Sequence, residues 1–245
     1  MNIPRLALIQ SLINKNQYSN YLEIGVSIGT VFFRVHCRNK IAVDPAFGFN
    51  RFKILTRSMR LGNFSNLSAG YFEKTSDDFF KDNAGKAIKG KLDISLVDGM
   101  HEYAYALNDI QNTLNYLSDD GVIIIHDCNP AKAENACTYE EWKKRGYTGE
   151  WNGDVWKSIV FLRSMRPELN VFVADTDYGL GIVTKKPVTP NQVRDRLGSG
   201  PLPFKSFEEI KAIDFSDFDK KRKEWLNLKP ASYLNDCFGL NLQFS

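Results

Sequence analysis

The sequence predicts an α/β fold in which helices cover both faces of a mostly parallel sheet. Two short runs rich in Val and Ile, Ile94–Val97 and Val122–Ile125, have the character of strands buried on both faces. They enclose a segment whose apolar residues follow helical spacing. A strand, a helix and a second strand form a right-handed crossover, so these two strands run parallel and end at one edge of the sheet.

Five further apolar runs are expected to join this sheet. They are residues 21–24, 40–44, 69–73, 171–174 and 180–184. The segment DTDYG connects the last two runs and predicts an antiparallel hairpin, after which the sheet needs no further strand.

Helical segments flank the predicted sheet at both ends of the chain. An apolar stripe over residues 3–13 predicts a helix that packs on the sheet, and residues 207–226 combine helical spacing with dense charge. We therefore expect one domain over 1–186, with its flanking N-terminal helix at 1–18, and a helical C-terminal extension over 187–245.

The composition excludes several classes of protein. Of the 245 residues, 43% are hydrophobic and 25% are charged, as is usual for a globular protein, and the net charge of +3 is too small to indicate nucleic-acid binding. No apolar run approaches the roughly 20 residues of a membrane span, and the N-terminus lacks a signal-peptide cleavage site. Four cysteines without a CxxC pair favour reduced thiols. We expect a cytoplasmic protein without a nucleic-acid or membrane partner.

Polar residues follow both central strands directly. Asp98 and His101 come after the first strand, and His126 and Asp127 come after the second. Ligands of open α/β sheets bind outside the carboxyl ends of the strands, so these four side chains are expected to converge on one cleft. Other roles remain open: Asp98 and His101 could cap or pack against the following helix, and His126 could point to the other face of its strand, because neighbours alternate.

A glycine turn follows the first predicted strand. Its pattern is Glu23-x-Gly25-x-x-x-Gly29, before a helix expected over 30–36. Glycine lets the backbone approach a ligand, and the pattern differs from the Gly-x-Gly-x-x-Gly of dinucleotide binders. Asp44 ends the next strand about 20 residues further on, where such folds present a carboxylate to ribose hydroxyls. Together these features favour a ligand that contains adenosine.

Two further segments could contribute to the cleft. Ser76 opens a helical segment and could either cap it or lie beside an adenine. The polar, aromatic-containing run 129–154 has the length of a functional loop and is expected to form the substrate wall. Asp154, at its end, is expected to cap the helix that begins next.

The motifs YLEIGVSIG, AVDP, LVDGMHEY and IIIHD resemble, in order and separation, those of class I S-adenosylmethionine-dependent methyltransferases. The resemblance covers about residues 21–185 and is closest to the branch with bacterial sugar and natural-product O-methyltransferases. It implies a Rossmann-like seven-stranded sheet whose last strand is antiparallel.

The resemblance also implies roles for particular residues. Glu23, Gly25 and Gly29 would cradle the methionine part of the cofactor, Asp44 would hold its ribose, and Ser76 would lie near its adenine. The cofactor carries a sulfonium cation, which acidic groups in the cleft, Asp98 among them, would favour electrostatically.

A hydroxyl acceptor must lose its proton before it can attack, and a bound divalent metal lowers the pKa of a hydroxyl. Metal-using relatives carry carboxylates at the positions of Asp98 and of the His126–Asp127 pair. Asp98 and Asp127 would suit Mg²⁺, whereas adding His126 or His101 would favour Mn²⁺, Fe²⁺ or Zn²⁺. Without a metal, His101 or Asp98 would act directly as the base.

The sequence thus predicts an S-adenosylmethionine-dependent O-methyltransferase with Asp98, His101 and Asp127 at its catalytic centre. The acceptor that the resemblance implies is a small carbohydrate-like molecule, a sugar or a glycosylated metabolite. Alternatives are a metal-free N-methyltransferase, a nicotinamide-dependent oxidoreductase and a non-catalytic nucleotide-binding module; the glycine pattern and Glu23 disfavour the oxidoreductase. Homo-oligomerisation stays open.

Overall fold

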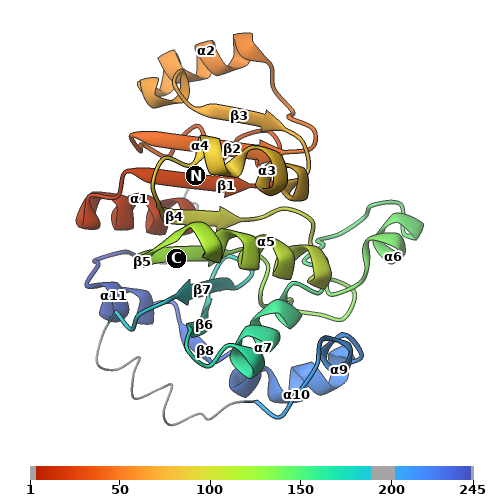
Figure 1. Ribbon diagram of the computed structural model, residues 1–245. Coiled ribbons are helices and arrows are strands. Elements are labelled where there is room, and N and C mark those ends of the chain that lie inside the picture. The colour runs from red at the N-terminus through yellow and green to blue at the C-terminus, as the bar shows by residue number, and fades with distance from the viewer. Residues whose placement is uncertain (1–3, 189–201, 244–245) are drawn as a thin grey trace. The chain divides into compact units, whose positions relative to one another are not determined.

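The computed structural model describes residues 4–188 and 202–243, which fall into two compact units. The first unit comprises the chain up to Gly99 together with Asn108–Ile123, and the second comprises Met100–Leu107 and the residues from Ile124 onward. Figure 1 labels their helices and strands.

The first unit is built on parallel strands. Its elements are α1 (Pro4–Asn16), β1 (Asn20–Ile24), β2 (Asn39–Asp44), α2 (Arg51–Leu61), the 3₁₀ turn η1 (Phe64–Asn66), β3 (Gly70–Glu73), α3 (Ser76–Asp82), α4 (Ala84–Ala87), β4 (Leu92–Val97), most of α5 (Tyr103–Tyr116) and most of β5 (Leu117–Ile125). The strands lie in the order β3-β2-β1-β4-β5. Leu22 at the middle of β1 is opposite Ile41 on one side and Ser95 on the other, and it is fully buried. These strands confirm the prediction that the apolar runs of this unit form a parallel sheet.

The second unit contains the predicted hairpin. Its elements are α6 (Tyr139–Lys144), α7 (Trp156–Met165), β6 (Asn170–Asp175), β7 (Leu180–Thr184), α9 (Phe207–Lys211), α10 (Phe215–Trp225), β8 (Leu228–Pro230) and α11 (Tyr233–Phe238). β6 pairs antiparallel with β7, with Phe172 opposite Ile182, as the sequence predicts.

The expectation that the hairpin would end the sheet is wrong. β8 pairs in parallel with β6, placing Val173 opposite Leu228, so the described residues contain eight strands where seven were expected. β8 has only three residues and ends in Pro230, which cannot donate a ladder hydrogen bond and is confined to strand edges. A segment this short has no alternating pattern that could predict it.

The predicted helix over 30–36 is also wrong, because the structure has a series of turns over 27–34. Scattered helical bonds occur, such as Phe33 N–H to the carbonyl of Gly29. A buried ammonium fixes the end of these turns: Lys40 Nζ donates to the carbonyls of Phe32 (2.5 Å) and Val35 (2.7 Å). Three-dimensional contacts therefore set this conformation more strongly than local helix propensity.

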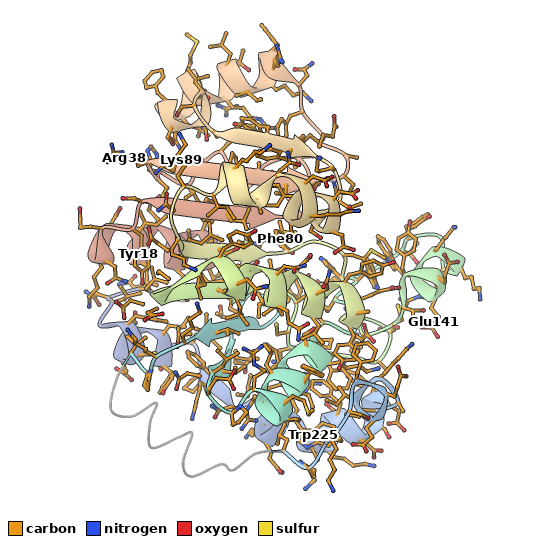
Figure 2. All side chains as sticks on the ribbon, in the orientation of Figure 1. Tyr18, Arg38, Phe80, Lys89, Glu141 and Trp225 are labelled. Carbon is orange, nitrogen blue, oxygen red and sulfur yellow. The ribbon has the colours of Figure 1, made fainter. Side chains whose placement is uncertain are left out.

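Within the second unit, the C-terminal segment packs against α7. The rings of Trp156 and Phe218 stack with centroids 4.0 Å apart, and Lys157 Nζ donates to the carbonyl of Lys211 (2.8 Å). Arg163 donates to the carbonyl of Trp225, which Figure 2 labels, at 2.9 Å. The extension is therefore held by buried rings and charge-assisted hydrogen bonds.

All four cysteines are free thiols, as the sequence predicts. Among the described residues, no helix combines the length and the apolar composition that crossing a bilayer requires.

Candidate active site

The glycine turn of the first unit requires its glycines. Gly25 has φ +83°, and a Cβ atom there would lie 1.9 Å from the carbonyl oxygen of Asp98. Gly29 has φ +76°, and its Cβ would lie 2.4 Å from the ring of Phe33. Ser27 between them also takes a positive φ of 50°, which costs a residue with a Cβ more than it costs glycine. The turn leaves no room for side chains at its two glycines.

Asp44 ties the end of β2 to this turn. One carboxylate oxygen accepts from the backbone N–H of Ser27 (2.7 Å) and the other from that of Ala46 (2.8 Å). Its side chain is buried, with 8% of the residue exposed. Each oxygen keeps a second lone pair, so the carboxylate can also accept from a ligand hydroxyl.

Glu23 lies under the glycine turn with 2% of the residue exposed, and its carboxylate accepts from the hydroxyl of Tyr21. Burial is the main cause that raises the pKa of Glu23 to about 8; the Tyr21 hydrogen bond opposes this rise, and the negative charge of Asp98 contributes to it. A buried carboxyl in this state gains from a cation placed beside it.

The raised pKa of Glu23 gives a prediction about stability. Because the folded pKa of about 8 exceeds the ordinary 4.5, the folded state binds more protons between these values, and the contribution of Glu23 to stability is lost as pH rises through this range. The free energy of unfolding of Glu23→Gln, measured in urea relative to wild type, should therefore rise by about 2–4 kcal/mol when the pH is raised from 4.5 to 8.5. The same difference between the two proteins at both pH values would contradict this account.

Asp98 follows β4 in the same unit and faces a cation of the N-terminal helix. Its carboxylate lies 3.7 Å from Nε of Arg5, and its backbone N–H donates to the carbonyl of Ile24 (2.9 Å). The first unit thus places Asp98 beside Gly25 and within electrostatic reach of Glu23.

Ser76 has a partner that the sequence analysis missed. It is the first residue of α3, while Thr75 is the N-cap. Its hydroxyl hydrogen-bonds Asp109 of α5, which is 3% exposed and whose Oδ1 has no hydrogen-bond partner. Burial raises the pKa of Asp109 to about 7. The sequence does contain a signal for this residue: Asp109 is an acid on the same face of an amphipathic helix as the inward-facing Ala106 and Ile110.

His101 is held by the loop that precedes α7. Its Nδ1 lies 2.9 Å from the carbonyl oxygen of Trp151, and the two rings stack with centroids 5.0 Å apart. Because a carbonyl oxygen only accepts, Nδ1 carries the hydrogen and Nε2 of the neutral ring carries the lone pair.

Asp154 caps a different helix from the one expected. Its carboxylate accepts from the backbone N–H of Tyr103 (2.6 Å) at the start of α5, and the N-cap of α7 is Val155, which makes no side-chain cap. A Cβ at Gly153 would lie 1.6 Å from the carbonyl oxygen of His101, so only glycine fits there. The chain around 153–154 therefore fixes the loop that carries His101.

Asp127 is the centre of the polar cluster in the second unit. It is 4% exposed and adopts φ 61°. Its Oδ2 lies 3.2 Å from Nδ1 of His101 and 2.9 Å from Nδ1 of His126, and its Oδ1 accepts from the amide of Asn152. The second unit thus brings together three of the residues that the sequence predicts.

His126 lies between two carboxylates. Its Nε2 is 3.4 Å from Oδ1 of Asp177 while its Nδ1 faces Asp127, and its side chain is 8% exposed. The sequence predicts neither Asn152 nor Asp177 as part of the site, because only the folded chain brings Asn152 to Asp127 and Asp177 to His126.

An aromatic cluster fills the predicted substrate loop. The rings of Trp142 and Trp151 stack at 8° with centroids 5.0 Å apart, and Tyr139 and Tyr147 contact them. A capping box between Thr138 and Glu141, labelled in Figure 2, starts α6 within this loop. Stacked rings give the loop a rigid aromatic wall next to His101.

The C-terminal segment reaches the loop after β5. Arg222 of α10 donates to Oδ1 of Asn129 (2.5 Å) and to the carbonyl of Pro130 (2.7 Å). Asn129 also donates to Asp175 at 2.9 Å. The extension thus holds the residues that directly follow Asp127 and Cys128.

Comparisons with known proteins agree with these observations. Residues 22–128 match the family model of a methyltransferase domain. A search of curated sequences finds no match. Among solved structures, a candidate O-methyltransferase from Klebsiella pneumoniae has a TM-score of 0.56 at 11% identity, with 75% of this chain and 80% of that chain covered.

Two further structures were solved with the cofactor or its product. The O-methyltransferase TomG from Streptomyces achromogenes, involved in tomaymycin synthesis and bound to SAM, has a TM-score of 0.52 at 12% identity. An O-methyltransferase from Bacillus cereus bound to SAH has a TM-score of 0.52 at 11% identity. Each comparison covers 75% of this chain and 80% of the other. The chain has the Rossmann-like fold of these solved structures, and its residues 22–128 match the model of a methyltransferase domain.

Proposed function

We propose that this enzyme methylates a hydroxyl of a small polar acceptor, a sugar or a glycosylated metabolite, with His101 as the general base. The observation that carries this proposal is the pair of contacts at His101 Nδ1, which the Trp151 carbonyl and Asp127 share. A base of this kind must be oriented, and its conjugate acid must be stabilised as it takes the proton. The carbonyl and the carboxylate meet these two needs.

His101 takes the proton of the acceptor hydroxyl at Nε2. The positive charge that then develops on the ring is stabilised by Asp127, 3.2 Å from Nδ1. His126 and Asn152 occupy the two oxygens of Asp127 and fix its orientation. In this assignment His126 positions Asp127, since both of its ring nitrogens already face carboxylates.

The donor set near His101 also fits a divalent cation. The carboxylate of Asp127 and the imidazole of His101, which lie together in the second unit, would be ligands for such an ion. A bound cation lowers the pKa of an attached hydroxyl. With His101 as ligand, Mn²⁺ or Fe²⁺ would be preferred over Mg²⁺, and solvent would then take the proton.

The first unit would bind the methyl donor. The cofactor, when bound, supplies an activated methyl group on a sulfonium ion. Gly25 and Gly29 form the close backbone turn, Glu23 offers a buried acid to the cationic methionine part, and Asp44 accepts from the ribose hydroxyls. Asp109 Oδ1, which has no hydrogen-bond partner, is available together with Ser76 for the adenine amine.

The acceptor class is supported by the aromatic loop. Tyr147 of this loop is 48% exposed and presents an aromatic face, and Glu150, three residues later, accepts from the hydroxyl of Tyr178 (2.7 Å). Aromatic faces pack against the apolar side of a sugar ring while carboxylates accept from its hydroxyls. The loop combines both groups in one short stretch of chain.

Methyl transfer from labelled S-adenosylmethionine to a panel of sugars, glycosides, catechols and amines tests the proposal, with added Mg²⁺ or Mn²⁺ and with a chelator. We expect a methyl ether on a carbohydrate hydroxyl. A methylated amine would instead identify an N-methyltransferase, and product formed equally in the chelator would exclude the metal. His101→Gln should abolish turnover, whereas the matched variant His36→Gln, at an exposed site, should not.

Asp44 gives a prediction for the cofactor site. Asp44→Ala should weaken S-adenosylmethionine binding about 10–100-fold, because hydrogen bonds to a charged group are lost. Calorimetry measures this affinity, and circular dichroism shows whether the fold is kept. An unchanged affinity would remove Asp44 from the ribose role.

A further inference from the structure

Helix α2 leaves most of its surface without protein contacts. Of its 11 residues only Ser58 is buried. Phe52, Met59 and Leu55 are 71%, 64% and 45% exposed, and two more apolar side chains just after the helix, Phe64 (63%) and Leu67 (50%), are exposed as well. An apolar group of this extent on one short segment usually marks an interaction surface.

The helix is nevertheless well defined. Asn50 caps its N-terminus by accepting from Lys53 N–H, and Gly62 ends it in the left-handed conformation at φ 62°. Arg57 anchors it to the glycine turn by donating to the carbonyl of Ile28, and its guanidinium lies 5.1 Å from the ring centroid of Phe33. Figure 2 shows side chains of α2 that point outward, away from the strands of its own unit.

The exposed apolar residues form one stripe between cations. At about 100° per residue, Phe52, Leu55 and Met59 fall within about 60° of the helix circumference. Lys53 and Arg60 lie on one side of this stripe and Arg51 lies on the other, while the helix contains no acidic residue. This is the pattern of a helix that lies flat at the boundary between lipid headgroups and acyl chains.

We propose that α2 docks this face on an anionic membrane surface. The stripe would enter the upper acyl layer while the flanking cations pair with lipid phosphates and snorkel toward water. A second copy of the chain fits less well, because α2 against α2 would bring the cations of both copies together. An acidic protein or a nucleic acid would match the cations and leave the apolar stripe in water.

This attachment differs from the expectation of no membrane partner. That expectation rests on the absence of a run long enough to span a bilayer, whereas a surface helix needs only a few apolar residues on one face. Net charge does not reveal it either, since the cations of α2 are offset by acids elsewhere in the chain.

Co-sedimentation of the full chain with vesicles tests the proposal. Vesicles of phosphatidylcholine alone are compared with vesicles that also contain phosphatidylglycerol, at low and at physiological salt. We expect binding to the anionic vesicles only, weakened by salt. Phe52→Ser with Met59→Ser should weaken it about tenfold or more, and Arg51→Gln with Arg60→Gln about fivefold for each cation.

Matched variants control for general loss of apolar surface or charge. Met165→Ser on α7, 39% exposed, and Lys220→Gln on α10 should leave vesicle binding unchanged. S-adenosylmethionine affinity and urea unfolding of each variant establish that the fold is intact.

Three results would overturn the proposal. One is no binding to anionic vesicles at low salt. The second is binding that the charge variant abolishes and the apolar variant leaves intact, which would assign the face to a soluble polyanion. The third is a dimer in analytical ultracentrifugation that Phe52→Ser dissociates while vesicles are ignored, which would assign the face to a second copy.

Discussion

Asp127→Asn should lower kcat by about 10²–10⁴-fold and leave S-adenosylmethionine affinity within twofold of wild type. The substitution keeps the shape of the side chain and removes the charge that stabilises protonated His101, 3.2 Å away. Asparagine tolerates the φ of 61° at this position better than most residues, so the backbone should be kept. Steady-state kinetics and calorimetry on the same preparation measure the two quantities.

Asp177→Asn is the matched control for this variant. It removes a carboxylate from a residue that also has positive φ, at 50°, and that contacts the opposite nitrogen of His126 at 3.4 Å. Because Asp177 contacts His126, which in turn contacts Asp127, we expect a loss of kcat below about tenfold. If Asp127→Asn kept a tenth of the wild-type turnover, or if both variants lost the same amount, the role of Asp127 would be wrong.

Gly25→Ala should abolish S-adenosylmethionine binding and destabilise the fold by several kcal/mol. The new methyl group would lie 1.9 Å from the backbone oxygen of Asp98, which cannot move without shifting the end of β4. Positive φ adds roughly 1–2 kcal/mol for a residue with a Cβ. Chemical unfolding measures the stability, and calorimetry measures the cofactor affinity.

Gly90→Ala separates the steric clash from the conformational strain. Gly90 has φ +86°, close to that of Gly25, but a Cβ there would meet no atom within 4 Å. This variant should lose only about 1–2 kcal/mol and bind the cofactor normally. Equal losses in the two variants would mean that strain alone explains Gly25 and that the close approach to Asp98 is unimportant.

The sequence predicts the strands well because burial on both faces leaves a direct trace in composition. Ile94–Val97 and Val122–Ile125 lie within β4 and β5, and the hairpin of β6 and β7 follows its turn residues. β8 cannot be predicted from its own three residues, because its strand conformation depends on pairing with β6 and on the anchoring of α10. The turns over 27–34 escape it because the distant Lys40 stabilises them.

The acids and imidazoles of the site are predictable where they lie at the end of a strand or within a few residues after it. Asp98, His101, His126 and Asp127 could be named for this reason, and the second unit does bring the last three together. Asn152 and Asp177 lie in loops that no local pattern links to Asp127. The sequence predicts Asp154 as the cap of the nearer helix, because no local pattern links it to Tyr103, which lies 51 residues away in the chain.

The hydrogen bonds from Arg222 to Asn129 and Pro130 bear on how the acceptor specificity of such an enzyme could change in evolution. Under the proposed function, changes in α10 would shift the loop beside the acceptor site and leave the proposed cofactor-binding residues unchanged. Replacing the C-terminal segment with that of another protein would therefore change the choice of acceptor more than the binding of the methyl donor.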